Sequence, residues 1–76
     1  MIEAYVLILT DVGTGGKVGA EAGKVAGVKL SQVVTGPYDV VARVEAGDMD
    51  GLSRLVDEIQ KIKGVTRTLT CPILNL

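Results

Sequence analysis

The sequence predicts an α+β domain with the element order β-α-β-β-α-β. Four segments are rich in β-branched and aliphatic residues, two others carry apolar residues at helical spacing, and glycine- or proline-containing turns separate them. Two β-α-β units that share one sheet make the ferredoxin-like plan, with an antiparallel four-stranded sheet. Right-handed crossovers then place both helices on one face, with the first and third strands in the middle.

The first half of the chain holds a strand, a turn and a glycine-rich helix. Aliphatic and β-branched residues predict the strand over Ile2–Thr10, and the glycine-rich turn Asp11–Gly16 follows. Three apolar residues then recur at helical spacing: Val18, Ala22 and Val25. Gly19 and Gly23 make this helix weak, because each costs about 1 kcal/mol relative to alanine.

Three further strands are predicted, over Val28–Thr35, Tyr38–Ala46 and Val65–Leu74. Gly36-Pro37 supplies the turn between the first two of them. Pro72 lacks a backbone N–H and cannot donate to a ladder, so the last strand is predicted to lie at an edge of the sheet or to bulge at that point.

A second, more regular helix begins after Asp48. Asp48 suits the N-cap position, and Asp50 in the first turn interacts favourably with the positive end of the helix dipole. Five apolar residues form one stripe along it: Leu52, Leu55, Val56, Ile59 and Ile62. Gly64 is predicted to end the helix as a left-handed cap.

The first strand carries apolar side chains on both of its faces. Alternation puts Ala4, Val6 and Ile8 on one face, and Tyr5, Leu7 and Leu9 on the other. Two helices cover only one face of a sheet, so the second face needs another partner. A second copy of the chain, packed sheet on sheet or strand beside strand, is the simplest one. The sequence thus favours a homodimer, and an unusually apolar monomer is the alternative.

Composition argues against several classes of function. The chain has 76 residues, enough for one small domain, of which 47% are hydrophobic, and its net charge is −1. This charge, together with the absence of Trp and Phe, disfavours nucleic-acid binding. The longest apolar run, Ala4–Leu9, is too short to span a membrane. A lone cysteine, Cys71, is typical of a reducing cytoplasm.

No pattern indicates a catalytic centre, a metal site or a cofactor. The chain has no His, so no imidazole is available to pair with Cys71 as a nucleophile. Acidic neighbours such as Asp48 and Asp50 do not converge on a substrate from a helix. The segment Thr14–Val18 departs from a phosphate-binding loop, because valine follows the lysine where Ser or Thr is required. We therefore interpret the chain as a non-enzyme.

Two polar segments are candidate ligand contacts. The first is Gly36-Pro37-Tyr38-Asp39, for which a solvated hairpin corner is the structural alternative. The second is a set of threonines that alternate along the last strand and therefore share a face: Thr66, Thr68 and Thr70. Their β propensity alone explains threonines in a strand, although three hydroxyls on an edge strand also suit a polar ligand.

Gly36-x-Tyr38-Asp39 at the start of a strand, and Gly64–Thr70 with its Thr-x-Thr spacing, together form a known pattern. They resemble the Gly-x-x-Asp signature and the last strand of the C-terminal effector domain of Lrp/AsnC regulators, the RAM module. The resemblance covers Ala4–Leu74, and Pro72 departs from the family's pattern. The helix-turn-helix domain of that family has no counterpart here, so the chain resembles a stand-alone form that does not itself bind DNA.

The resemblance implies a dimer formed through the sheets and further assembly, commonly into rings of four dimers. It also implies that a small effector, often an amino acid, binds between neighbouring dimers. The implied ligand contacts are Gly36, Tyr38 and Asp39 in the turn, and Thr66, Thr68 and Thr70 in the last strand. We hypothesise that Asp39 binds the ligand's ammonium group, while threonine hydroxyls and backbone N–H groups bind its carboxylate.

Several functions fit this pattern. The first is a cytoplasmic amino-acid-binding and assembly module that joins full-length regulators in mixed oligomers. The second is a purely structural assembly module. The third is an enzyme of the dimeric α-β barrel type, which the lack of His and Trp disfavours. An ACT-type regulatory domain has the same topology and ligand class, but the Gly-x-Tyr-Asp and Thr-x-Thr spacing favours the first function.

Overall fold

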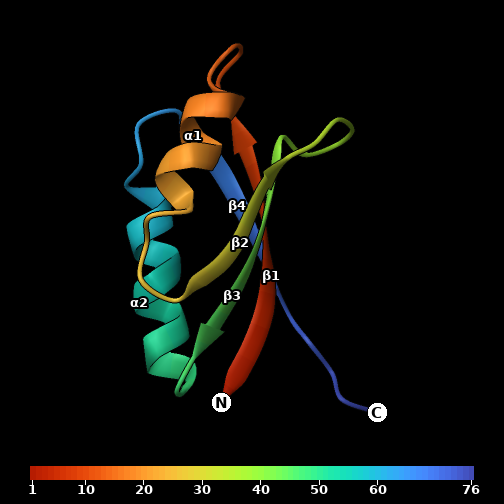
Figure 1. Cartoon of the computed structure of the whole chain (residues 1–76), viewed down its shortest axis with the longest axis vertical. Helices are drawn as coiled ribbons and strands as arrows, with labels where there is room; N and C mark the ends of the chain where they lie inside the picture. Colours follow the sequence, from red (N-terminus) through yellow and green to blue (C-terminus); the bar gives the residue numbers. More distant parts are fainter.

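In the computed structural model, which describes all 76 residues, a four-stranded sheet carries two helices on one face (Figure 1). The elements are β1 (Ile2–Thr10), α1 (Gly15–Ala22), β2 (Val28–Val33), β3 (Val40–Ala46), α2 (Met49–Gln60) and β4 (Val65–Pro72). All strand pairs are antiparallel, in the order β2-β3-β1-β4. The predicted ferredoxin-like fold, with the first and third strands in the middle, is confirmed. Neither helix has the length and the apolar run that a membrane span needs.

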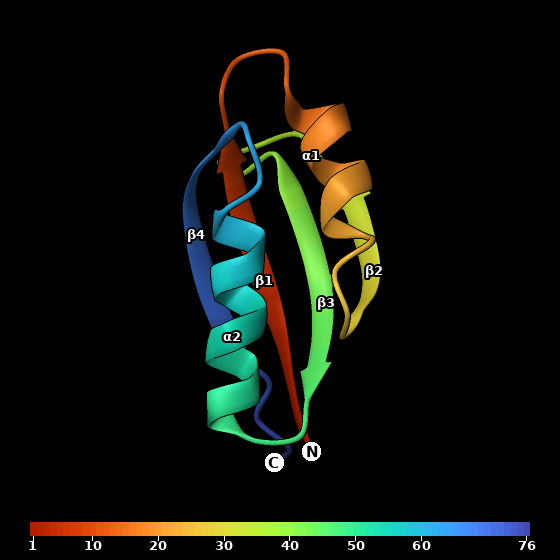
Figure 2. The same cartoon turned by 90° about the vertical axis from the view of Figure 1, so that its left-hand side faces the viewer.

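The core lies between the sheet and the two helices, which both cover the same face (Figure 2). Register pairs Ala4 with Val44 and Ile8 with Val40, so these side chains point to the same side. Eleven apolar residues are buried there: Ala4, Val6, Ile8, Val18, Ala22, Val40, Ala42, Val44, Leu52, Leu55 and Ile59. The faces predicted for the first strand are therefore confirmed.

α2 begins as predicted and ends earlier than predicted. The Oδ1 atom of Asp48 accepts a hydrogen bond from the N–H of Gly51 at 2.7 Å, which confirms the N-cap. Lys61 occupies the C-cap position, so the prediction that Gly64 caps this helix is wrong. Gly64 does have a positive φ of 104°, but it lies in the turn before β4, where a Cβ would come within 2.9 Å of the Oγ1 atom of Thr14.

α1 is shorter than the apolar spacing predicted. It ends at Ala22, and Val25 lies half-buried in the connection to β2 instead of on a third helical turn. Gly23 takes the C-cap position, and Gly27 follows with a φ of 96°. Glycines lower the stability of a helix, which explains why this one stops after eight residues.

The strands on either side of Gly36-Pro37 are shorter than predicted. β2 ends at Val33, and β3 begins at Val40, so that Tyr38 and Asp39 lie in the connecting loop. Gly36 has a φ of 129°, and proline cannot donate to a ladder, so the pairing stops on both sides of this dipeptide.

β4 lies at an edge of the sheet, as predicted, and ends at Pro72 instead of Leu74. Its irregularity lies at the opposite end from Pro72. Leu9 pairs with Arg67 and Thr10 with Val65, which leaves Thr66 as an extra, unpaired residue. This bulge turns the beginning of β4 relative to the rest of the strand.

Candidate functional site

Three connections meet at the end of the sheet where β1 stops, and we call this region the loop end. They are residues 11–14 after β1, residues 34–39 between β2 and β3, and residues 61–64 before β4. The first of these loops projects beyond the sheet (Figure 1). The N–H of Asp11 donates to the carbonyl oxygen of Gly64 at 2.8 Å, which joins two of the connections directly.

Asp39 is held across the end of β1 by three hydrogen bonds. Its Oδ2 atom accepts from the N–H of Thr10 at 2.8 Å and from the Oγ1 hydroxyl of Thr10 at 3.2 Å. Its own N–H donates to the carbonyl oxygen of Ile8 at 2.9 Å. The Oδ1 atom makes no hydrogen bond within the chain, and the residue is half-buried. One carboxylate oxygen is therefore anchored, and the other is free to accept a donor.

Gly36 and Tyr38 lie in the same loop as Asp39. Gly36 is exposed, and a Cβ built there would have no atom within 4 Å, so its backbone is open to solvent. Tyr38 is half-buried. The structure thus brings together the three residues predicted from the turn, with a carboxylate beside an accessible stretch of backbone.

The three predicted threonines of β4 do not share one surface with Asp39. Thr68 lies opposite Ile8 and Thr70 opposite Val6, so both side chains point to the helix-covered face. Thr66 is exposed in the bulge, where the strict alternation that predicted a shared face with Thr68 and Thr70 is interrupted.

Thr68 and Thr70 are both engaged beside α2. The Nε2 atom of Gln60 donates to the Oγ1 atom of Thr68 at 2.8 Å. Thr70 lines a groove of about 340 Å³ between α2 and β4, together with Met49 and Val56 among others. No cavity of the single chain is lined by both Asp39 and one of the threonines.

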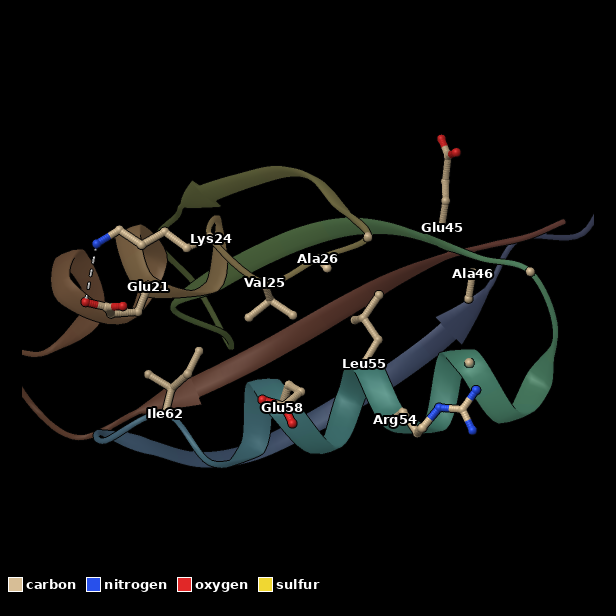
Figure 3. Close-up of a pocket in the computed structure, with 13 residues that line it drawn as sticks. Glu21, Lys24, Val25, Ala26, Glu45, Ala46, Arg54, Leu55, Glu58 and Ile62 are labelled. Atoms are coloured by element: carbon tan, nitrogen blue, oxygen red, sulfur yellow. Dashed lines mark ion pairs between the residues drawn. The ribbon is translucent and has the colours of Figure 1, made fainter.

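The largest cavity lies between the two helices and was not anticipated from the sequence. It is an open groove of about 770 Å³ with an apolar floor of Val25, Leu55 and Ile62. In Figure 3, Val25 and Leu55 face each other across the groove. The groove exists because α1 has 8 residues and α2 has 12, a difference of about 6 Å in length. Gly23 and Gly27, which flank Val25, are the sequence signal that α1 stops early.

The rim of this interhelical groove is charged. It carries Glu21 and Lys24, whose charged atoms lie 3.7 Å apart, and Arg54 and Glu58 from α2. All four residues are exposed, so the one ion pair among them, between Glu21 and Lys24, contributes little. A groove of this kind lacks the enclosed polar groups that orient a small ligand.

The face of the sheet opposite the helices, which we call the outer face, is apolar and uncovered. Register places Leu7 opposite Leu69 and Tyr5 opposite Cys71 on this face. Tyr5, Leu30 and Leu69 are 42%, 48% and 45% exposed. The predicted second apolar face is therefore present.

One charged cluster interrupts the outer face. Arg43 pairs with Glu3, and its Nη1 atom lies 3.2 Å from the Oε2 atom of Glu45. The hydrogen bond and the charge of Glu3, followed by those of Glu45, raise the pKa of Arg43 above its usual value. Arg43 is therefore charged at every pH at which proteins of this kind are handled.

A family model described as the Lrp/AsnC ligand binding domain matches residues 3–76. The chain belongs to this family. The protein TTHA0845 from Thermus thermophilus is 34% identical, with a TM-score of 0.92 over 100% of this chain and 96% of that one. The feast or famine regulatory protein of M. tuberculosis, solved in complex with L-methionine, is 25% identical, with a TM-score of 0.85. It matches over 100% of this chain and 52% of its own.

A curated relative of a different kind also matches part of this Lrp/AsnC domain. The homocitrate synthase of Sulfurisphaera tokodaii is 38% identical over 51 residues, which are 67% of this chain and 11% of the synthase. The chain therefore spans only about a tenth of the length of that protein.

The anchoring of Asp39 leads to a stability prediction. Asp39→Ala leaves the N–H of Thr10 without its acceptor, and we expect the free energy of unfolding to fall by about 1–3 kcal/mol. Asp39→Asn keeps a side-chain oxygen and should lose less. Urea unfolding measures both, with Asp57→Ala on the exposed side of α2 as a control expected to change by about 0.5 kcal/mol or less. Equal decreases in the free energy of unfolding for substitutions at positions 39 and 57 would contradict the anchoring role of Asp39.

Proposed function

We propose that this Lrp/AsnC domain is a sensor and assembly module that binds a small amino-acid effector and performs no catalysis. The match to the ligand binding domain over residues 3–76 is the observation that carries this proposal. The relative from M. tuberculosis, whose structure contains L-methionine, supports the ligand class. The free, exposed thiol of Cys71 fits a cytoplasmic location.

The effector site that we propose is centred on Asp39 at the loop end. The free Oδ1 atom accepts a hydrogen bond from the ligand's ammonium group. The hydrogen bonds from Thr10 to Oδ2 hold the carboxylate in one orientation. The open backbone at Gly36 and the half-buried Tyr38 form the adjacent wall. A charge-assisted hydrogen bond from an ammonium to a preoriented carboxylate is stronger than a neutral one.

The remaining contacts of the proposed site come from a neighbouring copy. Asp39 and the threonines of β4 line no common cavity within one chain. We propose that the exposed Thr66 of a neighbour provides the hydroxyl for the ligand's carboxylate, because Thr68 and Thr70 point to the helix-covered face of that strand. Ligand binding then depends on assembly, and assembly on the ligand, by the same coupling free energy.

The ligand proposal predicts a stability shift with one chemical group of amino acids. An amino acid at a hundred times its dissociation constant should raise the free energy of unfolding by about 2.7 kcal/mol. Denaturant unfolding in the presence of each of the twenty amino acids measures it. Asp39→Asn should weaken the binding of the active amino acid at least tenfold, because the charge that meets the ammonium is lost.

Asp11→Asn is the matched control for that experiment. Asp11 is an exposed aspartate at the same loop end, and its substitution removes the same charge without touching Asp39. An equal loss of affinity in both variants would mean that binding depends on the overall negative charge of the loop end and not on Asp39 itself. The absence of a shift with any amino acid would contradict the sensor function and favour the purely structural alternative.

We also propose that two copies pack outer face on outer face. Isolated apolar residues are normal on a protein surface, but a sheet face with aromatic and aliphatic residues on all four strands marks an interaction site, even where the charged cluster of Arg43 interrupts it. The patch lies on both central strands and both edge strands, with Tyr5, Val41, Leu30 and Leu69 as examples. A two-fold axis makes such a patch complementary to itself.

Leu69→Arg should convert the dimer into monomers. Leu69 is 45% exposed in the single chain, so the substitution leaves the protomer core intact while it places a charge in the proposed interface. Val12→Arg is the matched control, because Val12 is fully exposed at the tip of a loop away from the outer face. Analytical ultracentrifugation should give monomer for the first variant and dimer for the second. Dimers of both variants would refute the packing of outer faces.

Higher assembly and mixed assembly are the remaining parts of the proposal. We propose that dimers join at their loop ends into a ring, and that the chain enters the rings of full-length Lrp/AsnC regulators. A tagged full-length regulator from the same cell should therefore retain this chain through a column, and light scattering should give a ring mass below that of the regulator alone, because a shorter chain replaces some regulator subunits. The Leu69→Arg variant should not be retained. Failure of the wild-type chain to co-elute would exclude the mixed assembly.

A further inference from the structure

The C-terminal residues Ile73–Leu76 leave the sheet on the side away from the helices (Figure 1). The last backbone contact with the sheet is the hydrogen bond from the N–H of Ile73 to the carbonyl oxygen of Glu3, at 2.8 Å. Beyond it, Leu74 is 77% exposed and Leu76 is fully exposed. Three of these four residues are aliphatic, which is costly for a segment that has no surface to pack against.

The tail of residues 73–76 is long enough to reach a second sheet. Four extended residues span about 13 Å, and sheets that pack face to face lie about 10 Å apart. The tail starts from β4, which is an edge strand, so it leaves the sheet at its rim rather than over its centre. A partner sheet that packs on the outer face with its strands aligned to these presents one of its own edge strands to the tail.

Both edge strands offer an apolar side chain on the outer face. Leu30 lies on β2 and is 48% exposed, and Leu69 lies on β4 and is 45% exposed. The tail does not reach these residues in its own chain, because its backbone is directed away from the sheet (Figure 1). On a second copy packed on this face, Leu30 and Leu69 are the exposed leucines that its edge strands offer to the tail.

We propose that residues 73–76 of each protomer cross the dimer interface and pack Leu74 and Leu76 on an edge strand of the second copy. The inference rests on the outer-face dimer proposed above. It adds that each of the two tails packs on the other copy, which we call the clasp. Pro72 has a direct role in this arrangement: it ends the ladder at the point where the chain must leave its own sheet. The occupant of the outer face is then a second copy of this chain.

The test compares two tail variants by the dissociation constant of the dimer. Leu74→Ser combined with Leu76→Ser should raise this constant about tenfold or more, because two aliphatic side chains lose their contact with the partner. Asn75→Ser changes the same tail without removing apolar area, and it should leave the constant within about twofold. Neither variant alters the core, since all three residues are exposed in the single chain.

A second measurement locates the tail. In dimers mixed from isotope-labelled and unlabelled copies, filtered NMR spectra should show contacts from the Leu74 and Leu76 methyl groups of one copy to Leu30 or Leu69 of the other. Contacts confined to one copy would overturn the proposal, as would an unchanged dissociation constant in the double variant. In either case a wild-type dimer would leave the outer-face packing intact. A wild-type monomer would instead refute both the clasp and the outer-face dimer.

Discussion

β1 is hydrogen-bonded on both sides, to β3 and to β4, and it carries apolar side chains on both of its faces. The two helices cover one face of the sheet and pack on Val6 and Ile8 to form the core. The other face, with Tyr5 and Leu7, has no cover within 76 residues. A chain of this length buries only about 60% of its surface on folding, so the uncovered apolar face is the observation behind the proposed dimer.

The charged cluster on the outer face shows how such a surface is kept specific. Glu3 and Glu45 lie directly opposite each other in β1 and β3, an unfavourable pair of like charges, and Arg43 bridges them. The cluster retains one net negative charge. Burial of that charge beneath a partner is costly, so it opposes non-specific association through an otherwise apolar face.

The loop end depends on the same central strand. Asp39 accepts a hydrogen bond from Thr10, the last residue of β1. Asp11, which follows Thr10, donates a hydrogen bond to Gly64 in the turn before β4. One carboxylate oxygen therefore takes its position from the sheet, whereas the candidate hydroxyls of β4 lie on other surfaces. The division of the site between copies that we propose would make ligand binding and assembly depend on each other.

The six elements, the buried face of β1, the Asp48 cap and the edge position of β4 could all be predicted from the amino-acid sequence, as could the family pattern at Gly36–Asp39. These follow from local periodicity and propensity, which neighbouring residues carry. Three features required the folded structure: Thr68 and Thr70 point toward α2, Thr66 lies in a bulge, and Asp39 accepts hydrogen bonds from Thr10. Those contacts depend on the register between distant strands, because a one-residue change in pairing moves every side chain of a strand to the other face. The groove between the helices likewise depends on where α1 ends on the sheet.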